Sequence, residues 1–127
     1  MTPSANILLV ERYEDDARHI MELGHSEKRT PYHFTHVGLL ADALAFLRKS
    51  NTQLVLLNLN LHDSQGVDTL RTLIAENPFI PVVILSERED KAICTETMQL
   101  GAQDYLVKKD ITYDLLSRVI RYAIATC

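Results

Sequence analysis

Several polar residues stand directly after short apolar runs of this chain, where their side chains could do chemistry together. The runs are continuous rather than alternating, which is typical of strands buried on both faces of a parallel sheet. The carboxyl ends of such strands meet at one edge of the sheet, so we expect these residues to share a crevice. They are Glu11, Arg12, Asn58, Ser86, Glu87, Lys108 and Lys109. A carboxylate, an amide, a hydroxyl and an ammonium in one crevice suit an oxyanion or a metal–oxyanion pair.

The elements that must position these residues alternate along the chain. Apolar runs predict strands at 7–10, 32–37, 54–57, 81–85 and 104–107. Apolar residues spaced three or four apart predict helices at 13–23, 39–47, 67–76, 89–100 and 111–125. We expect Gly24, Gly101 and the pair Asn77-Pro78 to end three of these helices. Right-handed crossovers then give an α/β fold, a doubly wound five-stranded parallel sheet with five helices, as a single domain over 1–127.

Composition excludes several other classes of protein. The 127 residues are 46% hydrophobic and 24% charged, which is ordinary for a globular domain. With 13 Lys+Arg against 17 Asp+Glu, the net charge of −4 argues against direct nucleic-acid binding. Cys94 and Cys127 are far apart, so neither a disulfide framework nor a zinc site is predicted. The apolar runs fall far short of the roughly 20 residues of a membrane span, and no signal peptide is visible. We predict a cytoplasmic protein that does not contact a membrane.

Four segments together resemble the receiver domain of two-component response regulators: ILLVE, LVLLNLNLHDSQGVDTL, PVVILS and GAQDYLVKKD. The resemblance extends over 6–125, and it implies a flavodoxin-like sheet of strand order 2-1-3-4-5. In that family an aspartate at the end of the third strand accepts a phosphoryl group. That aspartate and two acids after the first strand bind Mg²⁺, while a hydroxyl and a lysine bind phosphate oxygens. An aromatic residue on the fifth strand takes part in switching.

Four positions match this pattern and three depart from it. The resemblance makes Glu11 the first acid, Ser86 the switch hydroxyl, Tyr105 the aromatic switch residue and Lys108 the phosphate-binding lysine. The departures are Arg12 in place of the second acid, Asn58 in place of the phosphoacceptor and Glu87 in place of a small residue.

The departures remove the chemistry that the family requires. The carboxamide of Asn58 is a very poor nucleophile, and the permanent cation of Arg12 cannot ligate a metal. The charge of the metal pocket moves from about −3 toward zero. Glu87 would narrow the mouth and repel an anion, or pair with Arg12 or Lys108. We therefore predict a pseudo-receiver for two-component signalling or a phosphorelay, acting by protein–protein interaction, with no catalytic residue, no cofactor and no Mg²⁺.

Other interpretations of the same residues stay open. Asn58 could be an engineered Asp→Asn change, Asp63 or Glu11 could be phosphorylated instead, or the crevice could bind a small anion. Arg12 could form a local ion pair with Glu11 or Glu87. Lys108 could bond Asn58 or a strand-end carbonyl, and Tyr105 could simply pack with its hydroxyl in water. No nucleophile–base pair indicates an enzyme.

The last helix indicates partners. It resembles receiver helices that lead into a signalling or output domain, although a stand-alone domain is equally compatible. Its apolar residues exceed one narrow stripe: Leu116, Val119, Ile120, Ala123 and Ile124. They predict burial against the sheet, or a homodimer through the fifth strand and the last two helices.

Overall fold

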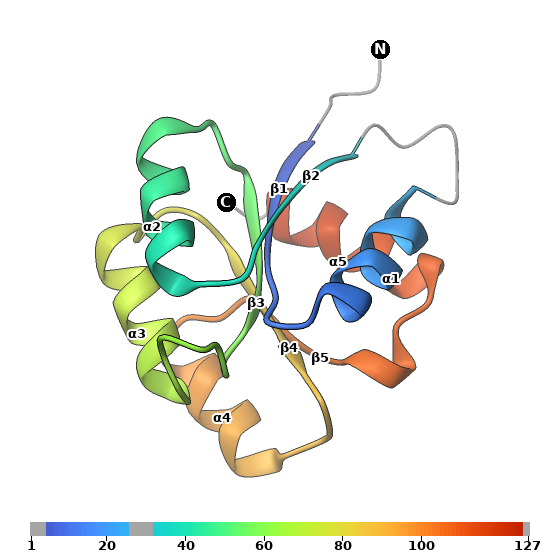
Figure 1. Cartoon of the computed structure of the whole chain (residues 1–127). Helices are drawn as coiled ribbons and strands as arrows, with labels where there is room; N and C mark the ends of the chain where they lie inside the picture. Colours follow the sequence, from blue (N-terminus) through green and yellow to red (C-terminus); the bar gives the residue numbers. More distant parts are fainter. Residues whose placement is uncertain (1–4, 26–31, 126–127) are drawn as a thin grey trace.

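One parallel sheet organises the part of the chain that the structure, a computed structural model, describes, which is residues 5–25 and 32–125. Its order is β2-β1-β3-β4-β5, which confirms the predicted doubly wound sheet (Figure 1). The strands are β1 (Ala5–Val10), β2 (Tyr32–Val37), β3 (Leu54–Asn58), β4 (Val82–Ser86) and β5 (Asp104–Val107). The order reverses between β1 and β3, and in this class of fold ligands bind beside that reversal, outside the carboxyl ends of the strands.

Helices cover both faces of the sheet. They are α1 (Glu14–Gly24), α2 (Leu40–Lys49), α3 (Val67–Glu76), α4 (Lys91–Gln99) and α5 (Tyr113–Ala125), with a short 3₁₀ helix η1 (Lys108–Asp110). Figure 1 shows α1 and α5 on one face and α2, α3 and α4 on the other. None of the described helices has the length and apolar character needed to cross a membrane.

Burial on both faces explains the continuous apolar runs. On one face Leu9 and Leu56 pack against α1 and α5, and on the other Leu8 and Leu57 pack against α2 and α3. All four leucines are fully buried. A central strand with two covered faces therefore has apolar residues on both of its faces, and the first polar residue after them marks the end of the apolar run.

Two helices begin two residues later than their apolar pattern predicted, because polar side chains cap them. The predicted helix 89–100 begins at Lys91, since the Asp90 carboxylate accepts a hydrogen bond from the Ile93 amide at 3.1 Å. The predicted helix 111–125 begins at Tyr113, and the Thr112 hydroxyl accepts from the Leu115 amide at 3.2 Å.

Gly24 ends the first helix, as predicted, and is the last residue of α1. A Cβ built on Gly24 would lie 2.5 Å from the Cε2 and Cζ atoms of Phe34 on β2. Glycine is therefore needed there for the close approach of the helix to an aromatic ring.

Gly24→Ala is expected to lower the free energy of unfolding by about 1–3 kcal/mol, because the new methyl group overlaps the Phe34 ring. Helix propensity alone would favour alanine by about 1 kcal/mol. Urea unfolding followed by circular dichroism measures the change. In a Phe34→Ala background the same substitution should cost nothing, and an equal cost in both backgrounds would contradict the steric explanation.

The loop between β3 and α3 is fastened to the start of α2 by Asp63. Its Oδ1 accepts from the Leu40 amide at 2.8 Å and its Oδ2 from the Ala41 amide at 3.0 Å. The N-cap residue itself, Leu39, offers no side-chain hydrogen bond. Burial tends to raise the pKa of the Asp63 carboxyl, but the amides of Ala41 and Leu40 outweigh it and hold that pKa below its ordinary value. This stabilisation is present at neutral pH and is lost as pH falls through the lowered pKa.

Candidate functional site

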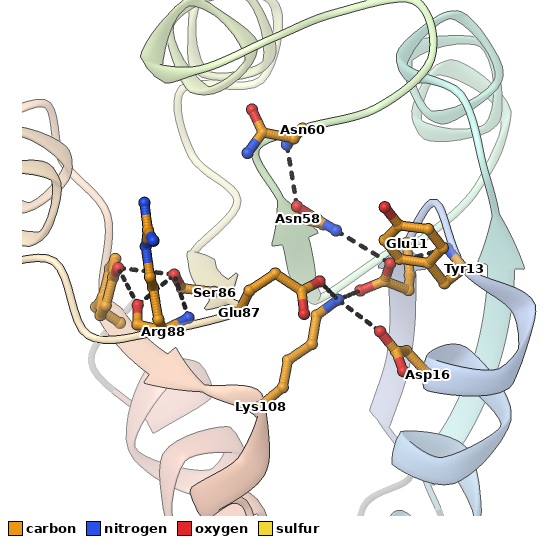
Figure 2. A network of polar contacts seen from close by, with 10 residues as sticks. Glu11, Tyr13, Asp16, Asn58, Asn60, Ser86, Glu87, Arg88 and Lys108 are labelled. Atoms are coloured by element: carbon orange, nitrogen blue, oxygen red, sulfur yellow. Dashed lines mark hydrogen bonds and ion pairs between the residues drawn. The ribbon is translucent and has the colours of Figure 1, made fainter.

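The carboxyl ends of four strands bring the predicted polar residues together. Glu11 follows β1, Asn58 ends β3, Ser86 ends β4 with Glu87 after it, and Lys108 follows β5. Figure 2 shows their side chains converging from these elements. The site therefore lies where the strand order reverses and extends across to β5.

Glu11 is the buried anion of the site, with no exposed surface. Its Oε2 accepts hydrogen bonds from the Asn58 Nδ2 at 3.0 Å and from the Tyr13 amide at 2.9 Å. Its Oε1 lies 2.6 Å from the Nζ of Lys108, an ion pair whose angles fall outside ordinary hydrogen-bond geometry. A buried carboxylate needs such compensation, because burying an ion without a partner costs roughly several kcal/mol.

Lys108 is surrounded by carboxylates. Its Nζ lies 2.7 Å from the Glu87 Oε1 and 2.9 Å from the Asp16 Oδ2, in addition to Glu11. An ammonium has three N–H donors, so each can face one carboxylate. The expected bond from Lys108 to Asn58 or to a strand-end carbonyl is therefore replaced by three ion pairs. Glu87 was expected to pair with Arg12 or with Lys108, and in the structure it pairs with Lys108.

Asp16 is a member of this cluster that the strand-end argument missed. It lies in the first turn of α1, five positions after Glu11, and so belongs to no strand. The sequence feature that could have indicated Asp16 is the acidic first turn of α1, Glu14-Asp15-Asp16, which follows the end of β1 closely in the chain. Only one of these three carboxylates reaches Lys108 among the described contacts.

The carboxylates hold Lys108 in its charged form. Burial tends to lower the pKa of the Lys108 ammonium, but its close contacts with the carboxylates of Glu11, Glu87 and Asp16 raise it to about 12 from 10.5. Because the folded-state pKa is the higher one, the stabilisation is complete below about pH 10.5 and is lost as pH rises toward 12.

Wild-type protein is therefore expected to lose about 2 kcal/mol of stability across this alkaline range through Lys108 alone. Urea unfolding at several pH values up to about 12 measures the loss. A Lys108→Met variant should lack this component, whereas Lys109→Met, at an exposed neighbour, should keep it. Identical alkaline profiles for the wild type and Lys108→Met would refute the assignment.

The amide of Asn58 is engaged at both ends. Besides donating to Glu11, it accepts a hydrogen bond on Oδ1 from the Asn60 amide at 3.0 Å. Asn60 in turn accepts from the Gly66 amide at 3.1 Å, which closes the β3–α3 loop. Asn58 is 4% exposed, and its side chain is held in place by these hydrogen bonds.

Ser86 and Tyr105 are joined by their hydroxyls. The Tyr105 hydroxyl donates to the Ser86 Oγ at 2.8 Å and lies 3.1 Å from the Arg88 carbonyl oxygen. The Ser86 Oγ donates to that same carbonyl at 2.7 Å. The Tyr105 hydroxyl, which was expected to lie in water, also joins β5 to the β4–α4 loop.

Arg12 is half-buried beside an aromatic ring instead of a carboxylate. Its guanidinium carbon lies 5.2 Å from the ring centroid of Tyr13, a cation–π contact. Its Nε is buried without a hydrogen bond among the described residues. The predicted ion pair of Arg12 with Glu11 or Glu87 is absent from the ion pairs of that part of the chain, and Lys108 takes both carboxylates.

A cavity of about 360 Å³ lies between the β3–α3 and β4–α4 loops. Its polar lining includes Asn58, Asn60, Ser86, Glu87 and Arg88. Across residues 5–25 and 32–125, no group of three or more His, Cys, Asp or Glu side chains is arranged to hold a metal ion. The site thus combines an internally paired ammonium with a small adjoining cavity.

Comparison with known proteins gives a consistent match. The sequence model of the response regulator receiver domain family matches residues 7–120. The swarming motility regulation protein RssB of Serratia marcescens is 33% identical over 114 residues, which is 90% of this chain and 51% of that protein. The transcriptional regulatory protein ZraR of Salmonella typhimurium is 33% identical over 84 residues, 66% of this chain and 19% of that protein. The chain thus spans about a fifth to a half of the length of these relatives.

The solved structures agree with this match. The crystal structure of a signal receiver domain from Vibrio parahaemolyticus superposes with a TM-score of 0.84 at 29% identity, covering 98% of this chain and 92% of that one. The phosphorylated cyanobacterial phytochrome response regulator RcpA gives a TM-score of 0.74 at 26% identity, covering 98% and 91%.

Proposed function

This chain belongs to the response regulator receiver domain family, and we propose that it acts there as a pseudo-receiver, a signalling module that works by protein–protein interaction without phosphorylation. The proposal concerns the site at the carboxyl ends of the strands. It requires that the phosphoacceptor and a metal ligand are substituted and that the lysine expected to bind phosphate is paired within the chain instead.

The observation that carries the proposal is the environment of Asn58. This residue stands where the family resemblance calls for the phosphoacceptor aspartate. Its carboxamide is a very poor nucleophile, and both of its ends are hydrogen-bonded, to Glu11 and to the Asn60 amide. A buried amide whose nitrogen and oxygen are both hydrogen-bonded has a structural role. Such an amide does not form an acyl phosphate.

The surrounding charges support the same proposal. Mg²⁺ prefers carboxylate oxygens and water in octahedral geometry. Here Arg12 brings a cation, Asn58 brings an amide, and both oxygens of Glu11 already face other groups. The donor set does not fit Mg²⁺. The three donors of Lys108 also face carboxylates, which leaves none for a phosphate oxygen.

The Ser86–Tyr105 contact supports a conformation set by the sequence alone. In the family, phosphorylation biases the hydroxyl and the aromatic residue toward an active arrangement. In this chain the two side chains are hydrogen-bonded to each other at 2.8 Å. We infer that the domain stays in one signalling conformation.

Intact mass after incubation with acetyl phosphate and Mg²⁺ tests the proposal. The wild type should gain no phosphoryl group, while Arg12→Asp/Asn58→Asp, which restores both acids, should gain one. Circular dichroism confirms that each protein is folded. A phosphorylated wild type would overturn the proposal. Asp63 is a poor substitute acceptor, since both its oxygens bind α2 amides.

A protein partner is proposed to bind the groove along α4, β5 and α5. The groove has a volume of about 620 Å³, and its lining includes Cys94, Tyr105, Val107, Asp110 and Leu115. A second copy of the chain is one such partner, as the last helix predicted, and another is a signalling or output domain. Sedimentation velocity of wild type and Leu115→Glu tests the homodimer. A monomer at all concentrations would exclude self-association and leave a different protein as the partner.

A further inference from the structure

Two contacts on opposite sides hold the start of the β4–α4 loop. On one side the Ser86 Oγ accepts a hydrogen bond from the Tyr105 hydroxyl at 2.8 Å. On the other side the Glu87 Oε1 lies 2.7 Å from the Nζ of Lys108. Figure 2 shows Glu87 extending toward Lys108 and away from Ser86 and Arg88. Successive side chains at the end of a strand point to opposite faces, so one short segment is restrained from both.

Lys108 is a fixed anchor for this segment. Its Nζ also lies 2.6 Å from the Glu11 Oε1 and 2.9 Å from the Asp16 Oδ2, which follow β1 and lie in α1, respectively. The same Nζ lies 5.5 Å from the ring centroid of Tyr13. The Lys108 side chain is 11% exposed and that of Glu11 is fully buried, so the anchor belongs to the interior of the domain. Of the three carboxylates, Glu87 is the one that connects this anchor to the β4–α4 loop.

The two chain neighbours of Glu87 provide both partners of the Tyr105 hydroxyl. One partner is the Ser86 Oγ, and the other is the Arg88 carbonyl oxygen, which lies 3.1 Å from the hydroxyl oxygen. The Ser86 Oγ donates to that same carbonyl at 2.7 Å, which joins the two partners to each other. A displacement of Glu87 therefore moves both partners of the Tyr105 hydroxyl together.

Tyr105 belongs to the walls of two separate hollows. It lines the cavity of about 360 Å³ between the β3–α3 and β4–α4 loops, together with Glu87. It also lines the groove of about 620 Å³ along α4, β5 and α5. The position of the Tyr105 side chain thus connects the charge of Glu87 with the surface that is proposed to bind a protein.

We propose that Glu87 is a positioning residue, which fixes the Ser86–Tyr105 contact through its ion pair with Lys108 and thereby sets the shape of the groove. This inference rests on the proposed function, because it names the residue that holds the one signalling conformation. A small uncharged residue at position 87, as the family resemblance calls for, cannot form this ion pair. The Glu87 side chain is 59% exposed, so dissolved salt screens the pair and weakens it. The shape of the groove therefore depends on ionic strength.

Fluorine NMR of protein labelled with 3-fluorotyrosine tests the inference, and Tyr105→Phe assigns the Tyr105 signal by its disappearance. In Glu87→Gln the ratio of joined to separated Ser86–Tyr105 contacts is expected to fall by about two- to fivefold, which is the factor that a partly exposed ion pair contributes. The Tyr105 signal should therefore move toward its position in Ser86→Ala, which lacks the hydroxyl partner. Asp16→Asn is the matched control, because it removes a carboxylate from the same ammonium without altering the loop, and its Tyr105 signal should stay at the wild-type position.

Salt provides a second measurement, which needs no substitution. Raising NaCl from about 0.1 to 1 M shortens the screening length from about 10 to 3 Å. The wild-type Tyr105 signal should then move in the direction that Glu87→Gln produces, and the signal of Glu87→Gln should show no such movement. If Glu87→Gln does not fold, the salt response of the wild type decides.

Three results would each overturn the inference: an unmoved Tyr105 signal in folded Glu87→Gln, an equal change in Asp16→Asn, or a wild-type signal that does not respond to salt. Neither measurement involves phosphorylation. Failure of this inference therefore leaves the intact-mass result unchanged, and a phosphorylated wild type would refute the pseudo-receiver without altering the Tyr105 signal of the unmodified protein.

Discussion

Replacing Lys108 with methionine is expected to lower the free energy of unfolding by about 3–5 kcal/mol at neutral pH. The side chain keeps a similar length, so the main loss is the charge. Glu11 would then be a buried carboxylate with no cation beside it, and Asp16 and Glu87 would repel it and each other. Breaking a buried ion pair by removing one partner is costly because the other charge stays buried.

Urea unfolding of wild type, Lys108→Met and Lys109→Met measures this effect. Lys109 is exposed, so its replacement should change the stability by less than about 0.5 kcal/mol. Adding Glu11→Gln to Lys108→Met should recover part of the loss, since the amide carries no charge. Equal stability of the two lysine variants would mean that Lys108 does not compensate Glu11.

Asn58→Asp is the second large effect, with an expected loss of about 3 kcal/mol at neutral pH. The substitution removes the donor that lies 3.0 Å from the Glu11 Oε2 and places a second carboxylate against it. Two like charges at that distance destabilise each other in a buried site. The loss should shrink at acidic pH, where one of the two carboxyls takes up a proton.

The matched control for this change is Asn60→Asp. Asn60 is exposed and accepts a hydrogen bond from the Gly66 amide, which a carboxylate can also accept. Its unfolding midpoint in urea should stay close to that of wild type. A comparable loss at both positions would show that the cost lies in the β3–α3 loop and not in the pairing with Glu11.

Sequence patterns could predict the sheet because its buried strands have apolar residues at every position. The same reasoning located Glu11, Asn58, Ser86 and Lys108, since each follows or ends a strand. It could not predict the bounds of α4 and α5, because the capping hydrogen bonds of Asp90 and Thr112 decide where those helices begin. Nor could it predict why position 24 requires glycine, because that depends on Phe34, which belongs to another element.

The sequence patterns also could not predict which charged side chains of the site pair with one another. The partner that a long side chain contacts depends on its rotamer, and the spacing of residues along the chain does not determine rotamers. Arg12 lies beside Tyr13 instead of a carboxylate, while Lys108 collects all three acids, including Asp16 from α1. These choices require the relative positions of α1, β5 and the β4–α4 loop in three dimensions.

The Asp63 contact with α2 has a consequence for amide hydrogen exchange. The first amides of a helix have no partner within the helix, so they ordinarily exchange rapidly with water. Those of Leu40 and Ala41 instead bind a carboxylate that belongs to the β3–α3 loop. Their exchange therefore requires that this loop detach, and we expect the loop and the first turn of α2 to open as one cooperative unit. Two segments more than 20 residues apart would thus share a single opening free energy.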